Sequence, residues 1–156
     1  MDSLATPGHR ALRTGRVSLP NHVYIVTAVT EGRTPVFLDS RAAAVACRAA
    51  FVGIRDSHFL AWVVMPDHFH GLLQLGEVSP LSEVMRCFKG GTAIEINRLL
   101  SRRGRLWQAS FHDRAVRRER DLETLARYII ENPLRAGIVT RVGDYPFWSA
   151  DWDWDM

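Results

Sequence analysis

The sequence predicts an α+β domain of the ferredoxin-like (RRM-like) type. In this fold a split β-α-β unit forms a central antiparallel sheet, here with an extra C-terminal helix that carries Tyr128. Two observations lead to this prediction. The local patterns follow one another as β-α-β-β-α-β-α, and the two central strand patterns are separated only by Pro66-Asp67, which indicates a tight hairpin turn. A length of 156 residues, with no internal repeat and no linker, fits a single domain.

The first half of the chain contains three strand patterns and one helix pattern. Residues 22–30 are rich in β-branched side chains and predict the first strand. Residues 39–55 begin with an Asp-Ser capping signal and are rich in alanine, which predicts the first helix. Residues 58–65 are apolar on both alternating faces, as expected of a central strand. Residues 68–75 follow the turn and predict its hairpin partner.

The second half alternates helix, strand and helix. Residues 80–101 predict a second helix, weakened or interrupted at the Gly-Gly pair 90–91, because glycine is a poor helix former. A basic loop then leads into a fourth strand over residues 110–117. Residues 119–132 predict the last helix, which we expect to stop at Pro133.

Composition limits the organisation and the class of protein. We expect a flexible basic lead over residues 1–19, one folded domain over 20–149 and an acidic tail over 150–156. No run of about eighteen apolar residues is present, which excludes a membrane-spanning protein, and the N-terminus lacks the apolar core of a secretory signal. Cys47 and Cys87 have neither disulfide-framework nor metal-site spacing, so we expect reduced thiols in a cytoplasmic protein.

The charge distribution indicates a nucleic-acid surface. Lys89 is the only lysine, and every other basic residue is an arginine. Ten basic residues and only three acidic ones stand between Arg86 and Arg120, with tryptophan and phenylalanine among them. Such a zone fits phosphate binding with base stacking. The alternative is a solvated arginine-rich face with no partner.

The stretch VVMPDHFHGLL places two histidines, one residue apart, in the most apolar part of the chain. Because side chains alternate across a strand, His68 and His70 project from one face, whereas Phe69 and Leu73 point to the other, toward the helices. Two parallel imidazoles on a rigid strand are a natural pair of metal ligands. The alternative is two hydrogen-bonded histidines at a half-open sheet face, and a metal role also needs a third ligand.

The last predicted helix supplies candidates for that ligand and for a nucleophile. Its apolar residues centre near Leu122 and Ile129, and Tyr128 lies roughly 120° from that centre. Tyr128 is therefore poorly placed for the core, and Asn132 follows one turn later on the same side. An amide oxygen suits a hard cation such as Mg²⁺ or Mn²⁺, and a tyrosine beside a metal-bound phosphate can attack it. The alternative for Tyr128 is packing against the sheet edge.

Four segments in order resemble one known family. "AWVVMPDHFHGLLQL" resembles the strand motif of the single-tyrosine HUH transposases of insertion sequences. "LWQASFHDRAV", followed by "ARYIIENPLRAGIV", resembles their REP-associated tyrosine transposase (RAYT) branch, and "VYIVTAVTEGRTPVF" is similar to the first strand of that branch. The resemblance covers residues 20 to 149, nearly the whole chain.

The resemblance implies a chemistry and assigns roles to residues. His68 and His70 would bind Mg²⁺ or Mn²⁺ with Asn132 as the third ligand, and Tyr128 would attack DNA to leave a 5′-phosphotyrosine and a free 3′-hydroxyl. An asparagine before proline suits the REP-associated branch, since many insertion-sequence relatives have glutamine there. The implied partner is single-stranded DNA beside a hairpin, handled at the nucleoid by a monomer or homodimer.

The DNA-binding candidates are basic side chains of the central zone and the last helix, with one aromatic residue that could stack on bases. They are Arg98, Arg102, Arg103, Arg105, Trp107, Arg114, Arg117, Arg118, Arg127 and Arg135. For Trp107 the alternative is a packed core anchor. Two other functions stay open at this point: a non-catalytic regulator that binds hairpin DNA, which would not need Tyr128, and a ferredoxin-like RNA binder, which would need aromatic residues on the central strands.

Overall fold

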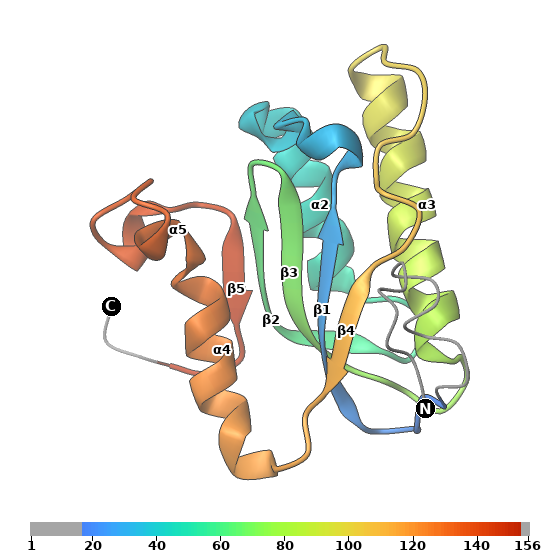
Figure 1. The fold of residues 1–156 in the computed structure, drawn as a ribbon, viewed down its shortest axis with the longest axis vertical. Helices are drawn as coiled ribbons and strands as arrows, with labels where there is room; N and C mark the ends of the chain where they lie inside the picture. The colour runs from blue at the N-terminus through green and yellow to red at the C-terminus, as the bar shows by residue number, and fades with distance from the viewer. Residues whose placement is uncertain (1–16, 154–156) are drawn as a thin grey trace, which may run out of the picture.

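A computed structural model describes residues 17–153 of the chain as one five-stranded antiparallel sheet with helices on both faces (Figure 1). The strand order is β4-β1-β3-β2-β5. The strands are β1 (Val23–Val29), β2 (His58–Met65), β3 (His68–Gln74), β4 (His112–Ala115) and β5 (Trp148–Ala150). The helices are α2 (Ser40–Val52), α3 (Leu81–Leu99), α4 (Leu122–Ile130) and α5 (Asn132–Arg135). Single 3₁₀ turns lie at Glu31–Arg33, Val36–Leu38, Glu119–Asp121 and Val142–Asp144.

The predicted ferredoxin-like topology is confirmed. β1 and β3 pair in the centre, β2 and β3 form the hairpin across Pro66 and Asp67, and β4 extends the sheet beside β1. Each of the four predicted strands lies inside its predicted range. The capping prediction also holds, because the Asp39 carboxylate accepts a hydrogen bond from the Arg41 backbone N–H at the start of α2.

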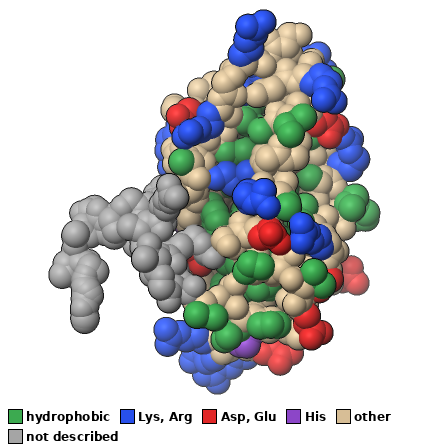
Figure 2. All heavy atoms as spheres, turned by 90° about the vertical axis from the view of Figure 1, so that its right-hand side faces the viewer, with side chains coloured by type: hydrophobic (Ala, Val, Ile, Leu, Met, Phe, Trp, Pro, Cys, Tyr) green, Lys and Arg blue, Asp and Glu red, His purple; other side chains and the backbone are tan. Residues whose placement is uncertain are grey.

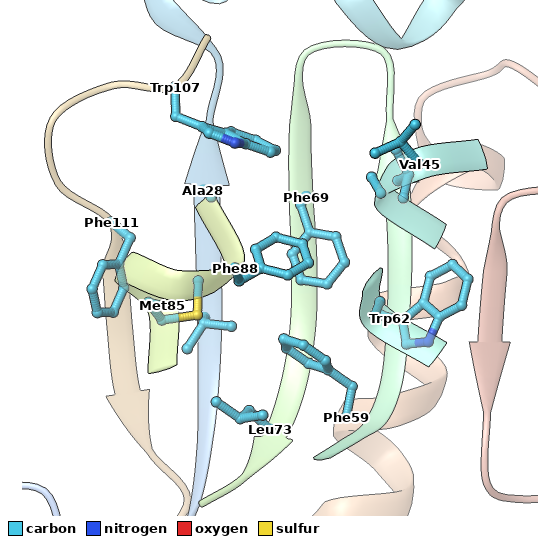
Figure 3. Packing of buried hydrophobic residues seen from close by; sticks show 14 of the residues in the cluster. Ala28, Val45, Phe59, Trp62, Phe69, Leu73, Met85, Phe88, Trp107 and Phe111 are labelled. Carbon is cyan, nitrogen blue, oxygen red and sulfur yellow. The ribbon is translucent and has the colours of Figure 1, made fainter. Parts of the chain in front are cut away.

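The larger core lies between the sheet and helices α2 and α3. Phe69 and Leu73 of β3 point into it, as strand alternation predicts, and meet Phe59 and Phe88 (Figure 3). The Phe69 and Phe88 ring centroids are 4.6 Å apart, and both side chains are fully buried. Aromatic packing of this kind stabilises the face of the sheet opposite the histidines.

The second core lies on the histidine-bearing face. Ala126 and Ile129 of α4 pack there with Leu72 of β3 and with Ala61 and Val63 of β2. Helix α4 therefore covers part of the sheet face that RRM-type RNA binders leave open for stacked bases. Figure 1 shows the C-terminal end of α4, with α5, at the same end of the sheet as the β2–β3 hairpin.

The C-terminal segment adds a strand that we did not predict. This segment folds back along the edge of the sheet, where β5 pairs with β2. The Tyr145 hydroxyl donates a hydrogen bond to the Val64 carbonyl at 2.5 Å, which anchors the approach to β5. β5 crosses the boundary predicted between residues 149 and 150, and Trp152 packs on the second core, so the folded unit extends to at least Trp152.

Helix α3 is continuous, so the interruption predicted at its glycines is wrong. Gly90 and Gly91 lie in its middle with helical neighbours on both sides. Their flanking residues Phe88 and Thr92 are buried against the core, and this tertiary packing overrides the low intrinsic propensity of glycine.

This geometry predicts that alanine at either glycine stabilises the protein. A Cβ atom at Gly90 or at Gly91 would meet no atom within 4 Å. Gly90→Ala and Gly91→Ala should therefore each raise the free energy of unfolding by about 0.5–1 kcal/mol, because alanine loses less backbone entropy. Urea denaturation measures this effect. Gly53→Ala is the contrasting control, since Gly53 has φ 83° and its Cβ would lie 2.7 Å from the Ser57 carbonyl oxygen.

The last predicted helix is divided into two. α4 ends at Ile130, two residues before the predicted end, and Glu131 separates it from the single turn of α5. Pro133 lies in the first turn of α5, directly after Asn132, where proline loses no hydrogen bond. Asn132 therefore lies outside the helix that carries Tyr128, contrary to our prediction.

Most of the lead predicted over residues 1–19 lies outside the described residues. Of the described part, Ser18 Oγ accepts a hydrogen bond from the Leu81 N–H, and the Leu19 N–H donates to the Tyr24 hydroxyl. Over residues 17–153, no helix combines the length and apolar content needed to cross a bilayer. Cys47 and Cys87 are free thiols, as expected, and burial raises the pKa of Cys47 to about 11.

Candidate active site

The histidine pair lies at the hairpin end of β3, on the face covered by α4. His68 pairs with Val29 and Met65 on the neighbouring strands, and His70 pairs with Thr27 and Val63. Both imidazoles are half-buried. The predicted projection from a single face is confirmed, because Leu72, two residues further along that face, packs against α4.

Asp67 fixes the orientation of the first histidine. His68 Nδ1 donates a hydrogen bond to Asp67 Oδ1 at 2.8 Å, and Arg33 Nη1 donates to Asp67 Oδ2 at 3.1 Å. Partial burial raises the pKa of Asp67, but the hydrogen bonds from His68 and Arg33 outweigh it and hold the pKa below its usual value. A carboxylate on Nδ1 sets the tautomer that presents Nε2 to a ligand. We had predicted Asp67 only as a turn residue; its position directly before His68 was the available signal.

Thr27 fixes the orientation of the second histidine, His70. Its hydroxyl and His70 Nδ1 form a 2.6 Å hydrogen bond across the β1–β3 pair. Burial, followed by the charges of His68 and Arg135, lowers the pKa of His70 to about 4, so this imidazole is neutral at pH 7. Among the described residues neither Nε2 atom has a hydrogen-bond partner. Both histidines are thus oriented through Nδ1, with the other nitrogen available, which is the arrangement of metal-binding imidazoles.

The lowered pKa of His70 predicts a pH-dependent stability. A histidine with pKa 6.5 when unfolded and about 4 when folded favours the folded state fully above pH 6.5, and this contribution is lost as the pH falls toward 4. Between pH 7.5 and pH 5 the loss should be about 2 kcal/mol. Urea denaturation at both pH values measures it. His70→Asn keeps a group able to bond Thr27 but does not titrate, so its free energy of unfolding should fall by about 2 kcal/mol less than that of the wild type over this pH range. An equal decrease in both proteins would contradict the assignment to His70.

Tyr128 is the tyrosine that solvent and a substrate can reach. Its side chain is 55% exposed, whereas Tyr24 and Tyr145 are 6% and 8% exposed. The hydroxyls of both buried tyrosines are also occupied by the backbone of Leu19 and Val64. The helical-wheel prediction that Tyr128 avoids the core is therefore confirmed, and the other two tyrosines have structural positions.

Arg135 of α5 stacks on Tyr128. Its guanidinium carbon lies 3.8 Å from the centroid of the phenol ring, and Nη2 donates to the Tyr128 carbonyl at 2.5 Å. We had predicted Arg135 as a DNA contact. In this structure Arg135 instead contacts Tyr128, the candidate nucleophile.

Asn132 follows Tyr128 by four residues and carries a side-chain amide. Its Nδ2 donates to the Ile129 carbonyl at 3.0 Å, which orients the amide and leaves Oδ1 without a partner in the described part of the chain. Within residues 17–153, no three His, Cys, Asp or Glu side chains lie close enough together to hold a metal ion. A site built on His68 and His70 therefore needs a ligand of another type, and an asparagine oxygen is one that Mg²⁺ or Mn²⁺ accepts.

The basic candidates divide among three places. Arg98, Arg102, Arg103 and Arg105 lie at the end of α3 and in the next loop, and Figure 2 shows basic side chains at the upper end of that face. Arg114, Arg117 and Arg118 line a groove of about 1020 Å³ beside β4. Arg127 and Arg135 belong to α4 and α5. Arg102 is half-buried and donates to Asn97 Oδ1 at 2.7 Å, so it also holds the end of α3.

Trp107 is a core residue, so its prediction as a DNA contact is wrong. It is 3% exposed, it packs against Phe37 and Phe88, and its Nε1 donates to Thr92 Oγ1 at 3.0 Å (Figure 3). No face of the ring is open to a base. The alternative that the sequence left open, a packed core anchor, is the one that the structure supports.

Comparison with known proteins decides the family. The model of the IS200-like transposases matches residues 18–132, which is most of the chain. The chain belongs to the IS200-like transposase family. The match includes the histidine strand, Tyr128 and Asn132.

Relatives of this family member support the predicted branch. Over 92 residues it is 30% identical to the REP-associated tyrosine transposase of Escherichia coli, in a match that covers 56% of this chain and 50% of that protein. Over 100 residues it is 29% identical to a Haemophilus influenzae protein assigned to the same branch, with 58% and 57% covered. The chain thus spans about half the length of the curated relatives it matches.

Solved structures confirm the fold of this IS200-like transposase. A REP-associated tyrosine transposase bound to a REP hairpin has a TM-score of 0.68 and 24% identity, and the similarity covers 90% of both chains. A transposase from Deinococcus radiodurans has a TM-score of 0.52 and 22% identity, with 74% of this chain and 93% of that chain covered.

Proposed function

We propose that this IS200-like transposase cleaves and rejoins single-stranded DNA, with Tyr128 as the nucleophile. The observation that carries the proposal is the exposure of Tyr128 beside the histidine-bearing end of the sheet, while both other tyrosines are buried and hydrogen-bonded. A regulator that only binds DNA would not need an exposed phenol at that position. Membership of a transposase family supports the same activity.

The proposed step is a transesterification. Tyr128 Oη forms a bond to the phosphorus of a phosphodiester, and the bond from phosphorus to the 3′-oxygen breaks. The phenol proton is released, and the leaving oxygen takes up a proton to become a 3′-hydroxyl. The DNA 5′ end remains on the protein as a phosphotyrosine. Because one ester replaces another, a second 3′-hydroxyl can reverse the step and join a new strand without ATP.

His68 and His70 fit a divalent metal ion because both imidazoles are oriented by hydrogen bonds at Nδ1, and among the described residues neither Nε2 atom has a partner. Together with the Asn132 side-chain oxygen they would hold Mg²⁺ or Mn²⁺. Such an ion polarises a phosphate and stabilises charge on a leaving oxygen. Thr27 orients His70 and Asp67 orients His68, each through a hydrogen bond to Nδ1.

This metal assignment predicts an effect of the Asp67 carboxylate. Asp67→Asn should weaken Mn²⁺ binding by roughly 10- to 100-fold, because the partner that holds the His68 tautomer loses its charge. Isothermal titration of the DNA-free protein with Mn²⁺ measures the affinity directly. Asp144→Asn, at an exposed position of the 3₁₀ turn Val142–Asp144, removes a carboxylate that is bonded to neither histidine in the described part of the chain and is the matched control. Equal affinities in both variants would exclude an orienting role for Asp67.

We propose single-stranded DNA next to a hairpin as the substrate. The support is twofold: relatives are REP-associated tyrosine transposases, and a similar structure holds a REP hairpin. Exposed arginines at the end of α3 and beside β4 would bind the phosphates. Such an enzyme would act in the cytoplasm, at the nucleoid.

A labelled cleavage assay tests the function. The protein is incubated with single-stranded DNA that carries a hairpin from repeats flanking its own gene, labelled at either end, with Mn²⁺ or Mg²⁺ or with a chelator. We expect a covalent adduct only with the fragment that bears the new 5′ end, and a released fragment with a 3′-hydroxyl. Hairpin binding with neither adduct nor nick, in both metals, would favour the non-catalytic regulator instead.

A further inference from the structure

The nucleophile helix is interrupted directly after Ile130. Glu131 has ψ 0°, and Asn132–Arg135 form the single turn of α5. In one straight helix, residues seven positions apart would be separated by about 10 Å along the axis. Across this break, the Arg135 guanidinium lies over the Tyr128 ring.

Arg135 holds Tyr128 in two ways. Its guanidinium stacks on the phenol ring at 3.8 Å from the centroid, and its Nη2 donates at 2.5 Å to the Tyr128 carbonyl. That carbonyl is one of the last four of α4, which have no partner within the helix. Glu131 lies 3.9 Å from Arg135 Nη1 and restrains the guanidinium from a third side.

We infer that Arg135 is a positioning residue, which fixes the phenol ring of Tyr128 in the orientation for attack. This inference rests on the proposed function, because it assigns Arg135 a role in the tyrosine's reaction. An exposed tyrosine on a helix end otherwise samples several rotamers. The planar guanidinium can stack on the ring and donate to the carbonyl together, and a lysine ammonium cannot reproduce that geometry.

The first experiment measures the stacking itself and needs no catalysis. Hydroxyl-radical footprinting, read by mass spectrometry, reports how accessible the Tyr128 ring is. Arg135→Ala should raise the oxidation rate of Tyr128 by about twofold or more, because one ring face loses its cover. Arg135→Lys should lie between Ala and the wild type. Arg141→Ala removes an exposed arginine elsewhere and should leave the rate unchanged. An unchanged rate in Arg135→Ala would overturn the inference.

The second experiment separates positioning from DNA binding. At saturating hairpin DNA, Arg135→Ala should form the covalent adduct roughly 10- to 100-fold more slowly, because a misoriented nucleophile seldom reaches the phosphate. DNA affinity, measured by fluorescence anisotropy, should change little, and Arg135→Lys should restore part of the rate. Lost affinity with an unchanged saturated rate would make Arg135 a phosphate contact and overturn the inference.

The two experiments also distinguish failure of the inference from failure of the proposed function. If the wild type forms no adduct while the footprint of Arg135→Ala still changes, the stacking role stands and the nuclease function falls. If the wild type forms the adduct and Arg135→Ala changes neither footprint nor saturated rate, the function stands and the positioning role falls. A thermal melt of each variant shows whether loss of the carbonyl bond has unfolded α4.

Discussion

Tyr128→Phe is expected to abolish formation of the covalent DNA adduct, with a decrease in rate of roughly a thousandfold or more. The substitution removes only the attacking oxygen. The ring is 55% exposed and stacks on Arg135, and phenylalanine keeps that stacking. Stability should change by less than about 0.5 kcal/mol, as for most exposed positions. Denaturing electrophoresis of end-labelled DNA measures the adduct, and binding to the same hairpin should persist.

The buried tyrosines are the controls for this prediction. Tyr145→Phe loses the bond to the Val64 carbonyl and should cost about 1 kcal/mol of stability, yet keep the adduct. Tyr24→Phe should behave similarly, since its hydroxyl bonds only the Leu19 backbone among the described residues. An adduct that survives in Tyr128→Phe would show that another residue is the nucleophile, and peptide mapping of the adduct would then locate it.

Trp107→Ala is expected to lower the free energy of unfolding by about 3–5 kcal/mol, the usual cost of truncating a large buried aromatic residue. The ring is 3% exposed and fills the space between Phe37 and Phe88, and its N–H bonds Thr92. The loop that leads to β4 should detach from α3 as the cavity forms. Urea denaturation measures the loss.

Trp107→Phe separates packing from base stacking. Phenylalanine retains an aromatic ring but leaves Thr92 Oγ1 without its donor, so it should cost less than alanine, about 1–3 kcal/mol. Under conditions where both variants are folded, their affinity for single-stranded DNA should equal that of the wild type. A stable Trp107→Ala protein with weakened DNA binding would reverse our assignment and return Trp107 to the DNA surface.

Local sequence patterns were sufficient for most of the fold. The β-branched run of β1, the Asp39 cap of α2 and the turn at Pro66 and Asp67 each depend on neighbouring residues, so they could be predicted without knowing the rest of the chain. Local rules failed where distant contacts outweigh propensity. Gly90 and Gly91 remain helical because their neighbours are buried against the sheet.

Two other differences have the same physical origin. β5 is a three-residue strand, Trp148–Ala150, whose sequence has no strand periodicity of its own and which exists because β2 presents an unpaired edge. Trp107 stands in a basic segment that resembles a DNA surface, but its burial depends on Phe37 and Phe88, far away in the sequence. Charge in the neighbouring residues therefore could not decide the environment of the ring.

For the site, the sequence by itself determined which side chains share a face. Strand alternation put His68 and His70 together, and helical periodicity kept Tyr128 out of the core; both follow from local backbone geometry. Only the tertiary structure decided the partners that orient them. Thr27 meets His70 through the β1–β3 register, and Arg135 stacks on Tyr128 across the break between α4 and α5. Pro133 signalled locally that the helix is interrupted, but the strand register and the contact of Arg135 with Tyr128 depend on the three-dimensional arrangement, which no local pattern encodes.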